Sequence, residues 1–120
     1  MRILVTGASG CVGHYISETL IQNTDHELFL FVRNPTKLQV DTNVRPGIHV
    51  ITADMMEIEK QADLLKTINV AVLTAAGWGG QEAFDINYIK THILLDLLDP
   101  QVCEQVIYFS TASVLDRHNQ

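Results

Sequence analysis

The sequence predicts an α/β protein built on one doubly wound parallel sheet with the strand order 3-2-1-4-5. Two observations predict this fold. Short apolar runs alternate with helical patterns along the whole chain, and the first run leads directly into glycines spaced three residues apart. Because crossovers between parallel strands are right-handed, these observations restrict the topology to very few arrangements.

The first part of the chain predicts two strands and a helix. Residues 2–6 form a short apolar run, and residues 27–32 ("ELFLFV") form a continuous one, which is typical of a strand buried on both faces. Residues 12–22 follow a helical pattern. We expect the face of this helix that packs on the sheet to contain Val12, Tyr15, Ile16, Thr19 and Leu20.

The rest of the chain continues the alternation. The segment "RNPTKL" breaks the second strand and starts a short helix. Further strands are expected over residues 48–52, 69–74 and 105–110, and helices over residues 55–66 and 81–98. No strand closes the sheet beyond the fifth, so we expect an incomplete domain spanning residues 1–120.

The composition limits the classes of function. The 120 residues carry a formal net charge of −6, which argues against a general nucleic-acid surface. The apolar runs are too short to cross a bilayer. The two cysteines, Cys11 and Cys103, have no CxxC spacing, and the five histidines have no metal-ligand spacing. We therefore expect a cytoplasmic protein with a small-molecule substrate, no metal, no nucleic acid and no membrane.

The glycines Gly7, Gly10 and Gly13 carry the first functional prediction. In a sheet of this kind, ligands bind at the carboxyl ends of the strands. Gly7 lets the chain turn sharply, Gly10 lets a pyrophosphate approach the backbone, and Gly13 lets the helix lie close to the sheet. The pattern predicts a dinucleotide on the helix N-terminus in a Rossmann-like domain; the alternative is a tight turn that binds nothing.

The end of the second strand indicates which dinucleotide is bound. Arg33 stands where an NAD site usually has an acidic residue, and arginine there suits the 2′-phosphate of NADP. Lys37 would assist it. We predict NADP, with NAD as the alternative, and the competing interpretation is a solvated loop arginine.

The other strand ends add three weaker predictions. Asp54 could accept a hydrogen bond from the adenine amine or cap the following helix. The small residues 75–77 leave room for a ribose and nicotinamide or make a plain turn. The hydroxyls of residues 110–113 could donate to a substrate oxygen or cap a helix.

Five segments in order resemble the extended short-chain dehydrogenase/reductase group, the NAD(P)-dependent epimerase/dehydratase family. They are "VTGASGCVG", which is similar to TGxxGxxG, then "ADM", "LTAAG", "NYIKTHILLD" and "VIYFSTASVLD". The last three differ from the family pattern, "LTAAG" by Leu73 and Thr74 in place of His-Leu.

The resemblance implies roles for residues at these positions. Those around the pyrophosphate would be Gly7, Ser9, Gly10, Cys11, Val12 and Gly13. The adenine would meet Asp54 and Met55, and the ribose and nicotinamide would meet Ala75, Ala76 and Gly77. Thr111 falls at the position of the family's catalytic Ser/Thr.

One departure from the family is large, because no tyrosine here precedes a lysine by four residues, as the family's Tyr-x-x-x-Lys requires. Thr111 alone cannot transfer the proton. We therefore expect the cofactor-binding part of a longer oxidoreductase, epimerase or dehydratase, acting on a nucleotide sugar or another hydroxyl or carbonyl compound, with a homodimer as one option. The alternatives are a non-catalytic NADP-binding protein, since "FVRNPTKL" resembles the NmrA-like subgroup, and an interaction domain that binds no nucleotide.

Overall fold

The computed structural model describes residues 1–8, 10–52, 55–75 and 81–110, with the side chains of residues 11, 55, 75, 81–88 and 110 left out. Its strands form one five-stranded sheet in the order β3-β2-β1-β4-β5, and every pair is parallel. The predicted fold class and strand order are therefore confirmed. The strands are β1 (Arg2–Thr6), β2 (Glu27–Val32), β3 (Ile48–Thr52), β4 (Val70–Ala75) and β5 (Gln105–Ser110).

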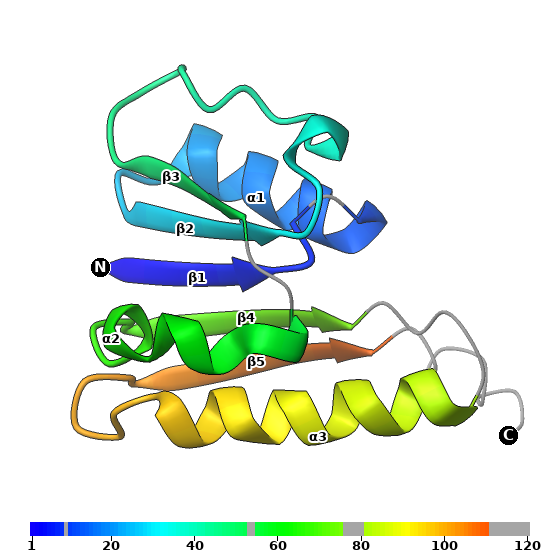
Figure 1. Ribbon diagram of the computed structural model, residues 1–120. Coiled ribbons are helices and arrows are strands. Elements are labelled where there is room, and N and C mark those ends of the chain that lie inside the picture. The colour runs from blue at the N-terminus through cyan, green and yellow to red at the C-terminus, as the bar shows by residue number, and fades with distance from the viewer. Residues whose placement is uncertain (9, 53–54, 76–80, 111–120) are drawn as a thin grey trace, which may run out of the picture.

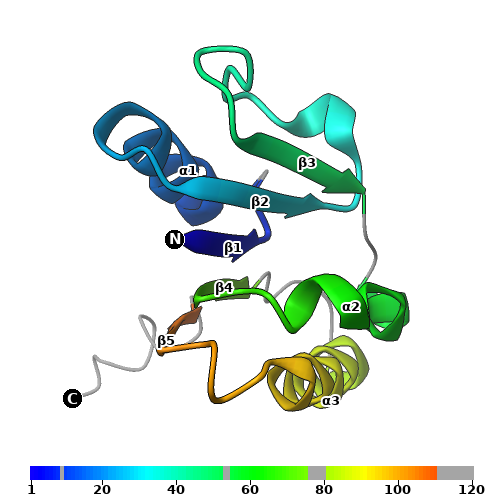
Figure 2. The same ribbon diagram turned by 90° about the vertical axis from the view of Figure 1, so that its left-hand side faces the viewer.

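Helices cover both faces of this sheet. On one face lies α1 (Cys11–Asn23); on the other lie the 3₁₀ segment η2 (Met55–Gln61), the short α2 (Ala62–Leu65) and the long α3 (Gln81–Leu97) (Figures 1 and 2). A second 3₁₀ turn, η1 (Pro35–Lys37), follows β2. The strand arrowheads all point the same way, so the carboxyl ends of the strands share one edge (Figure 1).

The core consists of two clusters, one on each face of the sheet. Leu4 and Phe29 pack with Ile58, Leu65 and Leu94 on the α2/α3 face. The alternate positions of the same strands pack with Ile21 on the α1 face. Residues 28–32 of β2 are all buried, which confirms the inference from its continuous apolar run.

The packing face predicted for α1 is partly wrong. Val12, Tyr15 and Thr19 are exposed, and the buried stripe is made by Gly13, Ser17 and Ile21, with residues 16 and 20 half-buried beside it. The two small residues let the helix approach the sheet closely. A Cβ on Gly13 would overlap the carbonyl oxygen of Gly7 and lie 2.9 Å from the Cα of Ala8.

The single helix predicted over residues 55–66 is also wrong in detail. The segment is a 3₁₀ turn with a kink at Glu57 (φ −122°, ψ 30°), followed by four residues of α-helix. Ile58 and Leu65 are both fully buried in the same cluster, against α3. Tertiary packing of these two side chains overrides the helical propensity of the sequence.

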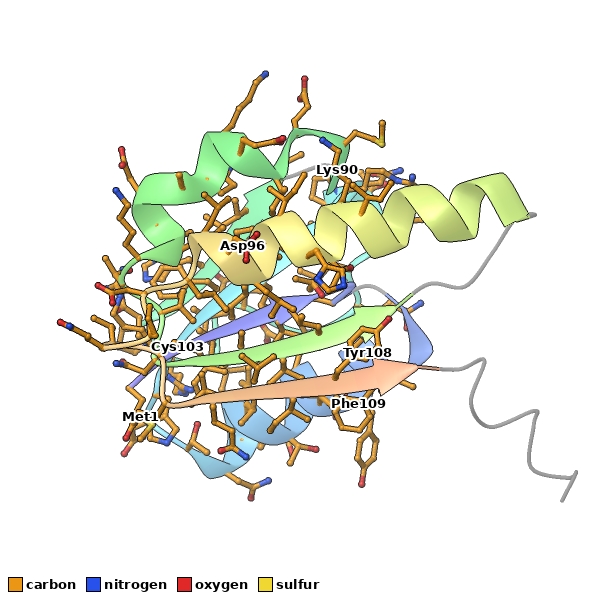
Figure 3. The ribbon with its side chains drawn as sticks, turned by 90° about the horizontal axis from the view of Figure 1, so that it is seen from below. Met1, Lys90, Asp96, Cys103, Tyr108 and Phe109 are labelled. Carbon is orange, nitrogen blue, oxygen red and sulfur yellow. The ribbon has the colours of Figure 1, made fainter. Side chains whose placement is uncertain are left out.

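The edge strand β5 keeps exposed apolar side chains on both of its faces. Val106, Tyr108 and Phe109 are 43%, 55% and 41% exposed. Tyr108 and Phe109 lie on opposite sides of the strand (Figure 3). Within the described residues, no strand pairs with the outer edge of β5. Among all the residues that the structure describes, no helix is long and apolar enough to cross a membrane.

A charged cluster links the amino ends of the three strands on one side of the sheet. The guanidinium of Arg2 and the ring of His49 each lie 2.8 Å from a different carboxylate oxygen of Glu27. Arg2 also lies over the ring of Phe29, which stacks on His49 with the ring centres 4.9 Å apart. The hydrogen bond from His49, with the nearby charge of Arg2, lowers the pKa of Glu27 below its usual value of 4.5.

We predict that Gly13→Ala lowers the free energy of unfolding by about 1–3 kcal/mol, because the added methyl group overlaps the Gly7 peptide. In an ordinary helix the same change stabilises by about 1 kcal/mol, so the sign of the change in unfolding free energy already tests the close packing. Urea unfolding followed by circular dichroism measures the change. Gly10→Ala, whose Cβ would lie 3.4 Å from the Gly7 carbonyl oxygen, an ordinary contact, is the control and should cost less. A more stable Gly13→Ala variant would contradict the close packing of α1.

We also predict that Glu27 contributes a pH-dependent part of the stability. Because its folded pKa is lowered, its stabilisation is complete above pH 4.5 and is lost as the pH falls through the folded pKa. Glu27→Gln should therefore reduce the loss of stability between neutral and acidic pH. Glu104→Gln, at an exposed carboxylate, is the control. Equal acid sensitivity of the wild type and Glu27→Gln would disprove the role of this cluster.

Candidate functional site

The turn after β1 lies at the centre of the shared carboxyl edge, between β2 and β4. Gly7 has a φ of +65°, a conformation that favours glycine. A Cβ on Gly7 would overlap the hydroxyl of Thr74 and lie 2.9 Å from the Thr74 carbonyl oxygen. The next amide, that of Ala8, donates to the Phe31 carbonyl oxygen on β2 at 3.3 Å. Gly7 therefore allows both a left-handed backbone conformation and a close contact with β4.

The N-terminus of α1 follows this turn directly. The Gly10 amide donates to the Gly7 carbonyl oxygen at 3.0 Å, and the Gly10 carbonyl oxygen accepts from the His14 amide at 2.7 Å. The next three amides, those of Cys11, Val12 and Gly13, have no acceptor within the helix, because the first turn offers none. The first turn of α1 also has no acidic residue. The start of α1 therefore offers amide donors and the positive end of the helix dipole.

The space over Gly10 is open. A Cβ there would meet only the Gly7 carbonyl oxygen, at 3.4 Å, among the described atoms. Gly10 has extended backbone (φ −79°, ψ 175°), so its conformation does not itself require glycine. An open glycine before a helix N-terminus with free amides fits an anion such as a pyrophosphate. The residues present at this turn therefore fit a dinucleotide.

The predicted phosphate-binding cations lie at the end of the neighbouring strand. Arg33 follows β2 directly, and Lys37 lies in the last turn of η1; both are exposed. Asn34 fixes the segment between them, because its side-chain oxygen accepts from the amide of Thr36 at 3.1 Å and from its hydroxyl at 2.7 Å. Thr6 of β1 is in register with Phe31 of β2, so Arg33 extends from the strand beside the glycine turn.

Several predicted site residues fall on parts of the chain that the structure does not describe. Those wholly outside the described residues are Ser9, Asp54, Ala76, Gly77 and Thr111. For three others only the backbone is described. Cys11 begins α1, Met55 begins η2, and Ala75 ends β4. The roles predicted for these eight residues stay predictions.

Two threonines at this edge were not identified from the sequence. The Thr74 hydroxyl donates to the Thr6 carbonyl oxygen at 2.6 Å, and the Thr74 amide donates to the Thr6 hydroxyl at 3.2 Å. These bonds join β1 to β4 beyond the last register pair, Thr6 with Leu73. A usable signal was present, since each threonine lies at or near the end of a strand that the predicted order makes a neighbour of the other.

Within the described residues, the electrostatics of this edge come from backbone dipoles and exposed cations. The carboxylates whose pKa is lowered, Glu27 and Glu59, lie elsewhere: the first at the amino end of β2, the second on η2. No group of three His, Cys, Asp or Glu side chains among the described residues could hold a metal ion. The described part of the edge is therefore suited to hold a phosphorylated ligand.

Several solved structures share this fold over less than half of their own length. A short-chain dehydrogenase/reductase from Veillonella parvula, in complex with NADP, is 18% identical with a TM-score of 0.66; the alignment covers 95% of this chain and 49% of that one. A UDP-N-acetylglucosamine 4-epimerase from Bacillus cereus is 22% identical with a TM-score of 0.70; the alignment covers 100% of this chain and 43% of that one.

A third structure holds both a cofactor and a sugar nucleotide. It is a UDP-glucuronic acid 4-epimerase mutant from Bacillus cereus in complex with NAD and UDP-4-deoxy-4-fluoro-glucuronic acid. It is 24% identical with a TM-score of 0.70, and the alignment covers 95% of this chain and 41% of that one. These likenesses confirm the expected Rossmann-like fold of short-chain dehydrogenase/reductases and epimerases.

The sequence itself gives the family. No curated protein matches it. The model of a family described as NAD(P)H-binding matches residues 7–120, which begin at the first glycine of the turn. Because that match spans nearly the whole chain and the turn fits a dinucleotide, this protein belongs to the NAD(P)H-binding family, and its predicted NAD(P) cofactor is confirmed at the level of the family.

Proposed function

We propose that this chain is the cofactor-binding part of an NADP-preferring oxidoreductase, epimerase or dehydratase. Its substrate would be a nucleotide sugar or another compound with a hydroxyl or carbonyl group. The observation that carries the proposal is the open space over Gly10, among the described atoms, beside the start of α1, whose first amides have no acceptor within the helix. The pyrophosphate of the cofactor would lie there and accept hydrogen bonds from these amides.

The residues of this chain would bind and orient the cofactor. The α1 amides would hold the pyrophosphate, while Arg33 and Lys37 would meet the 2′-phosphate from the neighbouring strand end. The small residues 75–77 would leave room for the nicotinamide above β4. A bound nicotinamide would accept or donate a hydride at its C4 atom, and Thr111 would hydrogen-bond the substrate oxygen.

The proton transfer would come from residues beyond these 120. The chain spans less than half the length of the three structures compared, and the exposed apolar residues of β5 offer an edge to a further strand of the same protein. A Tyr-x-x-x-Lys motif in that continuation would supply the base. We place the whole protein in the cytoplasm, and a homodimer suits it.

A second function is favoured by the segment "FVRNPTKL", which resembles NmrA-like proteins. Its Asn34-capped turn would hold NADP without catalysis, as in a redox sensor or assembly factor. The full-length protein, titrated with NADPH and then supplied with UDP-sugars and carbonyl compounds, separates the two functions. Turnover supports the enzyme, and tight binding without turnover supports the sensor.

We predict that Gly10→Val removes most NADPH binding and lowers stability by no more than about 1 kcal/mol, since valine is a poorer helix N-cap than glycine. The valine suits the extended backbone of residue 10, while its side chain fills the space proposed for the pyrophosphate. Isothermal titration calorimetry measures the affinity, and urea unfolding measures the stability. A matched Gly47→Val variant, whose glycine lies before β3, is expected to lose stability because the φ there is +87°, and to keep its affinity. Unchanged NADPH affinity in Gly10→Val would overturn the proposed pyrophosphate site.

We predict that Arg33→Asp shifts preference from NADP toward NAD. Loss of a charged hydrogen bond to the 2′-phosphate costs about 1.5–3 kcal/mol of NADPH binding energy. NADH lacks this phosphate and should bind at least as well as before. Dissociation constants for both cofactors decide the matter, with Arg45→Asp as a control because Arg45 caps the far end of α1. If Arg33→Asp leaves NADPH affinity unchanged, Arg33 does not contact the phosphate.

A further inference from the structure

The hydroxyl of Thr74 lies against the peptide that begins the glycine turn. Its Oγ1 donates to the Thr6 carbonyl oxygen at 2.6 Å and lies 3.3 Å from the Gly7 carbonyl oxygen. It also occupies the space that a side chain on Gly7 would need. This hydroxyl belongs to β4, far from the turn in sequence, and it is half-buried at the sheet edge.

The Gly7 carbonyl oxygen is held from several sides. The Gly10 amide donates to it at 3.0 Å, and Gly13 of α1 packs against it so closely that a Cβ there would overlap it. Thr74 approaches the same carbonyl from β4. The orientation of this one peptide therefore determines where Gly10 lies and where the first turn of α1 begins.

We propose that Thr74 is a positioning residue for the cofactor: its hydroxyl fixes the Gly7 peptide and, through it, the amides of α1 that receive the pyrophosphate. The inference rests on the proposed function for its ligand. Thr74 itself does not touch the phosphates; it acts through the turn. Without the Thr74 hydroxyl, the Thr6 carbonyl oxygen, which belongs to the peptide that enters Gly7, loses its hydrogen bond from β4, and the turn can rotate because a glycine tolerates many backbone conformations.

The test compares Thr74→Ala with Thr74→Ser, so that the two variants differ only in the hydroxyl. Thr24→Ala is the matched control, because the Thr24 hydroxyl donates to the Leu20 carbonyl oxygen at 2.7 Å at the opposite end of α1. Thr74→Cys is a further variant, which keeps a side chain of similar size with a weak donor. Each full-length protein is titrated with NADPH by calorimetry, and amide exchange of Gly10 is measured by NMR without cofactor.

We expect Thr74→Ala to weaken NADPH binding about fivefold, the equivalent of one neutral hydrogen bond, and Thr74→Ser to restore it. Thr74→Cys should fall between them. The Gly10 amide should exchange faster in Thr74→Ala than in Thr24→Ala, although both variants lose a hydroxyl bond. If Thr74 had a purely structural role, Thr74→Ala and Thr24→Ala would both lower the stability, and both would bind NADPH with the same affinity.

Two outcomes contradict the inference in different ways. If the wild type binds NADPH and folded Thr74→Ala and Thr74→Cys bind it equally well, Thr74 does not position the site, while the proposed function stands. If the wild type binds neither NADPH nor NADH, the proposed function fails and the inference fails with it.

Discussion

The contact between the Gly7 peptide and the first turn of α1 is the constraint on which the site depends. It exists because neither Gly7 nor Gly13 has a Cβ, so strand, turn and helix approach within van der Waals distance. This approach places the start of α1 beside the ends of β1 and β4. Between these two strands the sheet changes direction of growth, since β2 and β3 lie on one side of β1 and β4 and β5 on the other. The first amides of the helix, which have no acceptor within it, then lie at the edge at which a doubly wound sheet binds its ligands.

Among the described residues, the site gathers positive groups in a protein whose net charge is −6. It does so locally, because α1 has no acidic residue in its first turn and Arg33 and Lys37 follow the adjacent strand. The charged cluster of Arg2, Glu27 and His49 lies at the opposite, amino end of the strands. The charges proposed to bind the cofactor and the charges that stabilise the fold thus lie at opposite ends of the strands. A substitution in one group should therefore leave the other group in place.

Much of this fold could be predicted from the sequence because buried parallel strands leave continuous apolar runs, as residues 27–32 do, and right-handed crossovers limit their order. The glycine turn could also be predicted, because the three-residue spacing of its glycines is typical of a strand that turns into a helix at a dinucleotide site. The packing face of α1 could not, because Gly13 and Ser17 are buried by their small size rather than by hydrophobicity. The Thr74 hydroxyl bond was not predicted either: the strand order makes the two threonines neighbours, but the bond itself depends on the final alignment of two strands distant in sequence.

The central claim is that the amides at the start of α1 bind the pyrophosphate of a dinucleotide. Amide chemical shifts recorded by NMR while the full-length protein is titrated with NADPH test it most directly. The account predicts the largest shifts at Gly10, Cys11, Val12 and Gly13, with smaller ones at Arg33. Saturable binding that leaves these amides unshifted, or the absence of any shift with NADPH and NADH, would contradict it.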